Sequence, residues 1–303
     1  MSQWIHLDFL DAQRIIYIVF DVLIAIGLIT ALRYLSGWVS HVRSIPELAV
    51  KDNFAFGVSL AGGILALIIM LTGIVAENVA NSLFEQVRVV LGYGLLGVAL
   101  IKLGRSIQDR WFLKGISIQD EIIKGNMAAA IVDVANALVT ATVVRSVVVW
   151  VDVQGIWGLA SVVLTCLGAQ IVIGIMTKFW MHVFHRRHPK HFFTDALHNK
   201  QIAIATRYAC HTIGASLALS AGSGVVRFYA EGVGAQAVSL LAWLLCGIVL
   251  CLCISGLARL SRRFILAGVN IAQEIDDQNN LAIAAVEGAL YIGIGFYLLA
   301  LLG

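Results

Sequence analysis

The hydrophobic positions of this chain form long, nearly uninterrupted stretches. Stretches of about 20 apolar residues can cross a hydrocarbon layer of about 30 Å as helices. In lipid only helices and closed barrels satisfy the backbone hydrogen bonds, and these stretches lack the alternation of barrel strands. The sequence therefore predicts an all-α polytopic membrane bundle of eight transmembrane helices, over residues 14–37, 53–76, 87–104, 126–149, 155–181, 201–223, 235–258 and 280–302.

Composition excludes a soluble protein. Hydrophobic residues make up 60% of the chain and charged residues 13%, whereas soluble domains average about 45–50% and about 25%. So little polar surface cannot coat a globule in water. We therefore expect a multi-pass membrane protein.

The basic residues gather on one side of the predicted membrane. Lys and Arg concentrate on the cytoplasmic side of such proteins. Of the 21 basic residues, 16 lie at or after the ends of odd-numbered spans. These links are therefore predicted to be cytoplasmic, with both termini outside, and they would meet the anionic lipid headgroups of that face.

The chain contains an internal duplication. RWFLKGISIQDEI at 110–122 matches RFILAGVNIAQEI at 263–275, and NMAAAIVD at 126–133 matches NLAIAAVE at 280–287. Earlier in each half, NFAF at 53–56 resembles QIAI at 201–204. The sequence thus predicts two four-helix repeats, 1–150 and 151–303. An even helix count gives both repeats the same orientation, related by an axis along the membrane normal.

The motif residues also carry a family resemblance. Asn53-Phe54-Ala55-Phe56, Glu121-Ile122 and Gly125-Asn126-Met127-Ala128-Ala129 resemble the bacterial inner-membrane family called domain of unknown function 350, in two tandem copies over essentially the whole chain. The second copy departs from the pattern, with Gln201 for the opening Asn and Asn279-Asn280 for Gly-Asn. The resemblance implies a helical inner-membrane protein and brings no established activity and no catalytic residues.

Glu121 and Glu274 occupy equivalent motif positions, ahead of Asn126 and Asn280. They form either a site or a pair of anionic groups near helix N-termini, where the helix dipole favours negative charge.

Ionisable residues inside the predicted spans are the main functional candidates, because each costs about 2.5–3.5 kcal/mol to insert. Asp133 and Glu287 are equivalent under the repeat, and each lies about 10 Å inward from the N-terminus of its helix. Arg207 lies at a similar depth, and His211 follows on the same helix face. Asn136 shares a face with Asp133.

Two interpretations of these residues remain open. In one, Asp133 and Glu287 bind a cation or exchange protons, and His211 relays them, since its reference pKa of about 6.5 lies near physiological pH. In the other, Arg207 neutralises one carboxylate, Asn136 completes the hydrogen bonds, and the cluster only holds helices together. Asp21 is either part of the pathway or a hydrogen-bonded core residue. Gln170 is expected to join helices.

Other chemistry finds little support in the sequence. There is no HExxH, GxSxG or P-loop motif, so no enzymatic activity, cofactor or nucleic-acid partner is predicted. His182, His185, His188 and His191 lie three residues apart, but Pro189 interrupts the helix and Arg186 and Arg187 repel a cation. A basic loop at the lipid surface is favoured over a metal site.

Two functions follow as hypotheses. The first is a transporter or channel for protons or a small cation, based on the intramembrane carboxylates. The alternative is a non-transporting scaffold or sensor that assembles with itself or docks a cytoplasmic partner, based on the basic face and the small-residue stripes.

Overall fold

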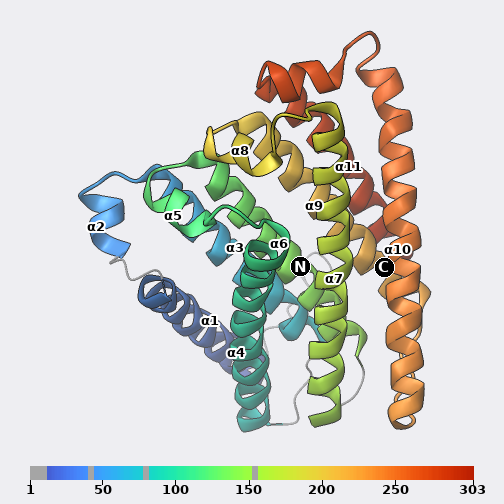
Figure 1. The fold of residues 1–303 in the computed structure, drawn as a ribbon. Coiled ribbons are helices and arrows are strands. Elements are labelled where there is room, and N and C mark those ends of the chain that lie inside the picture. Colours follow the sequence, from blue (N-terminus) through green and yellow to red (C-terminus); the bar gives the residue numbers. More distant parts are fainter. Residues whose placement is uncertain (1–11, 40–43, 78–81, 152–155) are drawn as a thin grey trace, which may run out of the picture.

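The computed structural model describes residues 12–39, 44–77, 82–151 and 156–303. The prediction of an all-α protein is confirmed for these residues (Figure 1). Long helices alternate with short helices and two π-helical turns. In chain order the elements are α1 (Ala12–Val39), α2 (Ser44–Ala49), α3 (Phe54–Glu77), α4 (Leu83–Ile107), η1 (Gln108–Phe112), α5 (Ile118–Ile123), α6 (Met127–Trp150), α7 (Ile156–Arg187), α8 (Phe193–His198), α9 (Ile202–Val225), α10 (Gly232–Ile265), η2 (Gln273–Asp277) and α11 (Leu281–Leu302).

Within the described residues, seven helices are long and apolar enough to cross a membrane: α1, α3, α4, α6, α7, α10 and α11. A multi-pass membrane protein is therefore confirmed. The predicted span at 201–223 forms the 24-residue helix α9, but its polar residues, including Arg207 and His211, keep it out of this set. Residues 1–11 of the predicted first repeat and residue 155, where the fifth span was expected to begin, lie outside the described residues.

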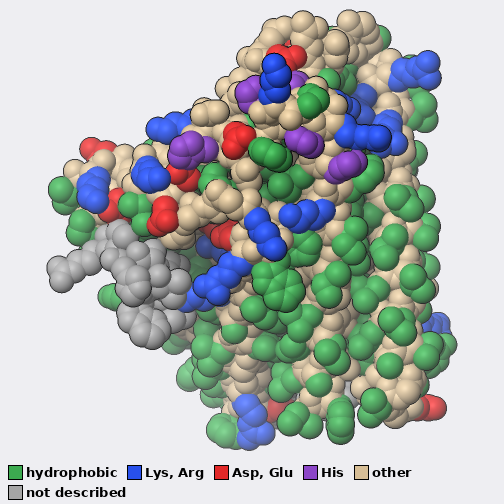
Figure 2. Space-filling view, viewed as in Figure 1, with side chains coloured by type: hydrophobic (Ala, Val, Ile, Leu, Met, Phe, Trp, Pro, Cys, Tyr) green, Lys and Arg blue, Asp and Glu red, His purple; other side chains and the backbone are tan. Residues whose placement is uncertain are grey.

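Four long helices form the centre of the molecule. Helix α3 packs against α6, α6 against α9, and α9 against α11. The other long helices flank this row, with α1 and α4 against the first-half helices and α7 and α10 against α9. Figure 2 shows hydrophobic side chains over α4, α7 and α10, and basic, histidine and acidic side chains gathered toward α5 and α8. One end of the bundle is therefore polar and rich in charged residues.

Each of the four central helices is entered through the same kind of turn. In all four turns, the residue directly before the N-cap residue of the helix has a left-handed backbone conformation. Its φ angle is 48° at Asp52, 77° at Gly125, 59° at Lys200 and 52° at Asn279. Gly and Asn tolerate this conformation best. The turn follows α2, α5, α8 and η2 in sequence, and Figure 1 shows α2, α5 and α8 toward the same end of the molecule.

Side chains at these turns cap the helices. The Asn126 side-chain oxygen accepts hydrogen bonds from the backbone N–H groups of Ala128 and Ala129, at 3.0 and 3.4 Å. Asn280 caps α11 in the same way. Such a cap satisfies N–H groups that have no partner within the helix.

The second copy caps α9 by a different route. Gln201 makes no side-chain cap, and the Ala203 N–H donates instead to Asn279 Oδ1 at 2.8 Å. The two departures from the family pattern, Gln201 for Asn and Asn279 for Gly, are thus complementary. Asn279 fits the left-handed position that Gly125 occupies in the first copy and also supplies the cap that Gln201 lacks.

Close contacts between helices depend on glycine at particular positions. A Cβ atom added at Gly214 of α9 would lie 2.8 Å from the Tyr291 backbone oxygen of α11, while one added at Gly293 would meet nothing within 4 Å. The α9–α11 contact therefore requires glycine at 214 and not at 293.

We expect Gly214→Ala to lower the free energy of unfolding by about 1–3 kcal/mol, because the new methyl group forces two backbones apart. Thermal unfolding of the purified protein in detergent measures this effect. Gly293→Ala is the matched control and should be neutral or stabilising, since alanine favours helix by about 1 kcal/mol. Equal stability of the two variants would contradict the packing argument.

Candidate functional site

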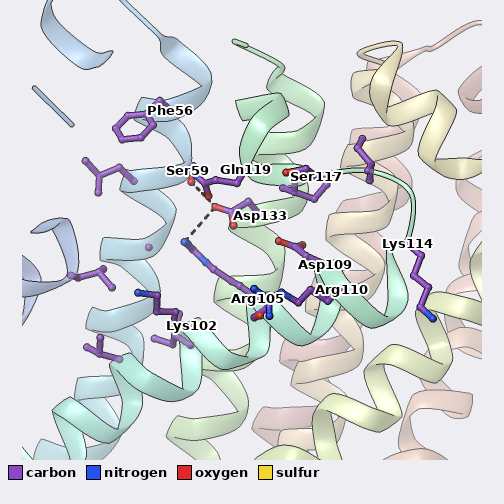
Figure 3. Close-up of a pocket in the computed structure, with 18 of the residues that line it drawn as sticks. Phe56, Ser59, Lys102, Arg105, Asp109, Arg110, Lys114, Ser117, Gln119 and Asp133 are labelled. Carbon is purple, nitrogen blue, oxygen red and sulfur yellow. Dashed lines mark hydrogen bonds and ion pairs between the residues drawn. The ribbon is translucent and has the colours of Figure 1, made fainter. Parts of the chain in front are cut away.

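Asp133 lies on the inner side of α6 and is 4% exposed. Its Oδ2 atom accepts a hydrogen bond of 2.5 Å from the Ser59 hydroxyl of α3. Arg105 of α4 places its Nη1 atom 3.5 Å from the same oxygen (Figure 3). Three helices of the first copy thus converge on one carboxylate.

Asp133 lines a cavity of about 700 Å³, here called the first-repeat cavity. Helices α1, α3, α4 and α6 and the link from η1 to α5 form its walls. Figure 3 shows that Asp109, Arg105 and Asp133 lie close together, with Ser117 and Gln119 nearby. The charged residues that line the cavity are Lys102, Arg105, Asp109, Arg110, Lys114 and Asp133.

Glu287 of α11, the repeat partner of Asp133, lies in a different environment. It is fully buried and pairs with Arg207, whose Nε atom is 2.9 Å from Oε2. Arg262 of α10 contacts Oε1, and His211 Nε2 lies 3.7 Å from the same atom. We call these four residues the Glu287 clamp.

A second carboxylate extends the Glu287 clamp toward the polar end. Arg207 Nη1 lies 3.1 Å from Asp276 Oδ1, and the Asp276 Oδ2 atom lies 3.5 Å from Arg187 and 3.6 Å from His188. The adjacent cavity measures only about 50 Å³. The second copy is therefore closed where the first is open.

The repeat alignment explains this difference. The match of NFAF with QIAI aligns Ser59 with Arg207, and the match of 110–122 with 263–275, continued backward, aligns Asp109 with Arg262. A small hydroxyl and an acid in the first copy are thus replaced by two arginines in the second. These arginines neutralise Glu287 and fill space that remains empty around Asp133.

The same alignment places Gly63 opposite His211. The His211 ring lies 3.7 Å from the Tyr291 ring and 4.4 Å from the Trp180 ring, between centroids. Gly63 has no side chain and lines the first-repeat cavity. The second copy therefore has an imidazole packed between two aromatic rings where the first copy has a glycine beside Arg105.

The structure brings some predicted residues together and separates others. Arg207 and His211 both reach Glu287, while Asp133 has its own partners on α3 and α4. Asn136 does not bond Asp133 and instead accepts a hydrogen bond of 2.9 Å from the Tyr208 hydroxyl of α9. A shared site for the two carboxylates is thus absent from the contacts among the described residues.

The remaining polar residues inside the spans join helices. Asp21 of α1 accepts hydrogen bonds from Gln86 of α4, at 3.2 and 3.0 Å. Gln170 of α7 donates to Thr140 of α6 and accepts from Gln108. These contacts give Asp21 and Gln170 hydrogen-bond partners that lipid cannot provide.

The family-motif residues hold the entry turns of the central helices. Glu121 Oε2 accepts a hydrogen bond from Asn126 at 2.9 Å, and Glu274 accepts the corresponding bond from Asn280 at 2.8 Å. Asn53 donates to Glu47 at 3.3 Å. The carboxylates thus orient the capping asparagines.

One of these turns also joins the two copies. Glu121 Oε1 is 2.9 Å from Lys124 and 3.2 Å from His198 of α8, and the Asn126 amide donates to the Leu197 carbonyl. Burial acts to raise the pKa of Glu121, but hydrogen bonds from Asn126 and Lys124 outweigh it and hold this pKa below its ordinary value of 4.5.

The histidines in the last turns of α7 and directly after it do not converge on one point. His188 faces Asp276 and Asp277, while the His185 ring stacks on the Phe192 ring with centroids 4.9 Å apart. Across the described residues, no group of three or more His, Cys, Asp or Glu side chains could hold a metal ion.

Sequence reasoning missed Arg105 and Ser59 as partners of Asp133, Asp109 as a lining residue of the same cavity, and Arg262 and Asp276 as parts of the second cluster. In the sequence, Arg105 and Arg262 stand out only as two of the basic residues near the ends of the predicted spans. The repeat alignment contained a usable signal, because positions that change from neutral or acidic to arginine mark where the two copies differ in charge.

Comparison with known proteins adds the family. The model of the family described as Domain of Unknown Function (DUF350) matches residues 9–148 and again residues 153–302. The chain belongs to the DUF350 family. No curated protein and no solved structure matches it. The resemblance inferred from the motif residues, including its two tandem copies, is confirmed.

We expect Glu287→Gln to lower the stability of this DUF350 protein by about 3–5 kcal/mol, because it removes the carboxylate that pairs with Arg262 and leaves Arg207 with Asp276 alone. Asp133→Asn should cost about 1 kcal/mol, since asparagine can still accept the Ser59 hydrogen bond and the site borders a cavity. Thermal unfolding in detergent compares the two variants. Similar losses of stability in the two variants would contradict the difference between the surroundings of Asp133 and Glu287.

The lowered pKa of Glu121 gives a dependence of stability on pH. Its contribution is present above the unfolded pKa, near 4.5, and is lost as the pH falls through the lower folded value. Glu121→Gln should therefore be less stable than the parent at pH 6, with a smaller loss of stability on acidification below pH 4.5. Asp120→Asn, an exposed change on the same helix, is the control. Parallel pH profiles for parent and Glu121→Gln would contradict the assignment.

Proposed function

We propose that this DUF350 protein is a proton-coupled transporter and that the first-repeat cavity is its working site. The observation that carries the proposal is Asp133, an ionisable group within a membrane span that borders a cavity of about 700 Å³. Such groups are costly in a membrane and commonly mark ion or proton pathways. Asp133 is bound by one hydroxyl and one long ion pair, so it lies outside the tight charge cluster that holds Glu287.

We propose the following membrane arrangement. The basic links place α2, α5 and α8 in the cytoplasm of a bacterial inner membrane and both termini outside. Helix α9 is the eighth span. It can cross the bilayer because Arg207 and His211 face Glu287, and most of its residues are buried by neighbouring helices.

The two copies then have different tasks. The Glu287 clamp combines one carboxylate with two arginines and a histidine and leaves almost no cavity, which suits a rigid support. The first copy keeps an open cavity and a lightly held acid. We infer that the first copy carries the solute and that no covalent chemistry takes place.

A specific observation favours the scaffold or sensor as a second candidate. Leu67, Met70 and Ile74 of α3 are fully buried beyond the level of Asp133, so tightly packed side chains close that part of the bundle. A protein that never opens there would transport nothing. It would instead use its basic end to bind anionic headgroups, a cytoplasmic protein or a second copy of itself.

Proton flux into liposomes tests the proposal. Vesicles with reconstituted protein and a pH-sensitive dye inside should dissipate an imposed pH gradient faster than empty vesicles. Asp133→Asn should reduce the protein-dependent rate at least tenfold, because asparagine cannot exchange a proton.

Glu231→Gln, an exposed change at the start of α10, is the matched control and should leave the rate unchanged. Protein-dependent flux that survives Asp133→Asn would remove this residue from the mechanism. A parent protein without any flux, with or without added solutes, would leave the second candidate as the better one.

A further inference from the structure

The first-repeat cavity carries an excess of positive charge. Four basic side chains line it, Lys102, Arg105, Arg110 and Lys114, against the two carboxylates Asp109 and Asp133. Like charges in one cavity repel each other and attract a counter-charge. A ligand with negative charge would therefore be favoured there over a cation.

Arg105 offers a defined binding edge. Its Nη1 atom faces Asp133 at 3.5 Å, while its buried Nε and Nη2 atoms have no hydrogen-bond partner among the described residues. A buried donor without a partner is costly. Two donors on one guanidinium edge match two oxygens of a phosphate or carboxylate.

Gly63 lies close against this edge. A Cβ atom at Gly63 would lie 3.2 Å from Arg105 Nη2, so glycine lets the guanidinium pack beside α3. The cavity is within the range of about 300–1,000 Å³ typical of small-molecule sites. It also contains the hydroxyl groups of Ser106 and Ser117, which can donate to further ligand oxygens.

We infer that the first-repeat cavity binds a phosphate group, with Arg105 as its main contact and the other basic side chains of the lining as counter-charge. This inference rests on the proposed function and deepens it by naming the class of the transported solute. Four basic side chains against two carboxylates leave an excess of two positive charges, which a doubly charged phosphate balances better than a singly charged carboxylate. The group belongs either to a free phosphate compound or to a lipid headgroup.

The two neighbouring carboxylates couple this binding to protons. A bound anion beside Asp109 and Asp133 adds negative charge near both, which favours their protonation. The cations that oppose this effect are Lys102, Arg105, Arg110 and Lys114. Coupling between two ligands is reciprocal, so protonation should in turn strengthen anion binding.

Ligand-dependent thermal stability tests the inference without any transport assay. The purified protein in detergent is titrated with inorganic phosphate and, separately, with short-chain phosphatidic acid, at constant ionic strength. A ligand that binds only the folded state raises the unfolding temperature. Arg105→Gln should weaken binding at least tenfold. Arg263→Gln, an exposed change at the end of α10, should bind like the parent.

A second variant tests the inference even if Arg105→Gln fails to fold. Gly63→Ala keeps every charge but crowds the guanidinium edge, and it should weaken binding several-fold. The source of the phosphate group follows from the parent protein: phosphatidic acid that binds over a hundredfold tighter than inorganic phosphate indicates a lipid, and comparable affinities indicate a free compound. Absence of stabilisation by both ligands, or equal binding by parent and Arg105→Gln, would overturn the inference.

Sulfate tests whether anion binding is coupled to protonation, because the charge of sulfate is constant between pH 5.5 and 8. The parent should bind sulfate more tightly at the lower pH, and Asp133→Asn should bind it more tightly than the parent at pH 8 with a weaker dependence on pH. Phosphate binding without proton flux would refute transport and keep the inference. Proton flux through Asp133 with no anion binding would support transport and overturn the inference.

Discussion

The structure depends on one constraint: lipid cannot satisfy a polar group, so every polar group inside the bundle must find its partner there. In the central row α3, α6, α9 and α11, contacts between helices hold Asp133, Asn136 and Glu287. Helix α9 is the clearest case, because Arg207 and His211 lower its apolar character and both reach Glu287. Burial among other helices, more than hydropathy, keeps this helix inside the molecule.

The two copies repeat the same sequence of helices, but they differ in the charged residues around their equivalent acids. Both copies keep an acid seven residues after the asparagine that caps the last helix. Around Asp133 the neighbours are a serine and one distant arginine, while around Glu287 they are two arginines and a histidine. The larger side chains neutralise the acid and fill its surroundings. A single duplicated position can therefore be an accessible group in one copy and a structural one in the other.

The turns at the polar end of the molecule share one construction. Four central helices begin with a left-handed residue and then a capping position, and acids at Glu47, Glu121 and Glu274 hold the capping asparagines in three of the four turns. Where one cap was lost, at Gln201, Asn279 of the neighbouring turn replaces it. The motif that identifies the family thus describes how the central helices begin, and the chemistry proposed for the protein lies farther along these helices, around residues outside that motif.

Local pattern determined the class, the approximate positions of the long helices, the two tandem copies and the equivalence of Asp133 and Glu287 within them, because length, hydropathy and repetition can be read along one chain. Tertiary structure decided the rest. It separated Asp133 from Glu287 by placing α9 against both α6 and α11, gave Asn136 to Tyr208, and brought Arg105 beside Asp133. These outcomes depend on which helix faces reach each other and on how much space the side chains leave, and sequence spacing within one helix carries neither quantity.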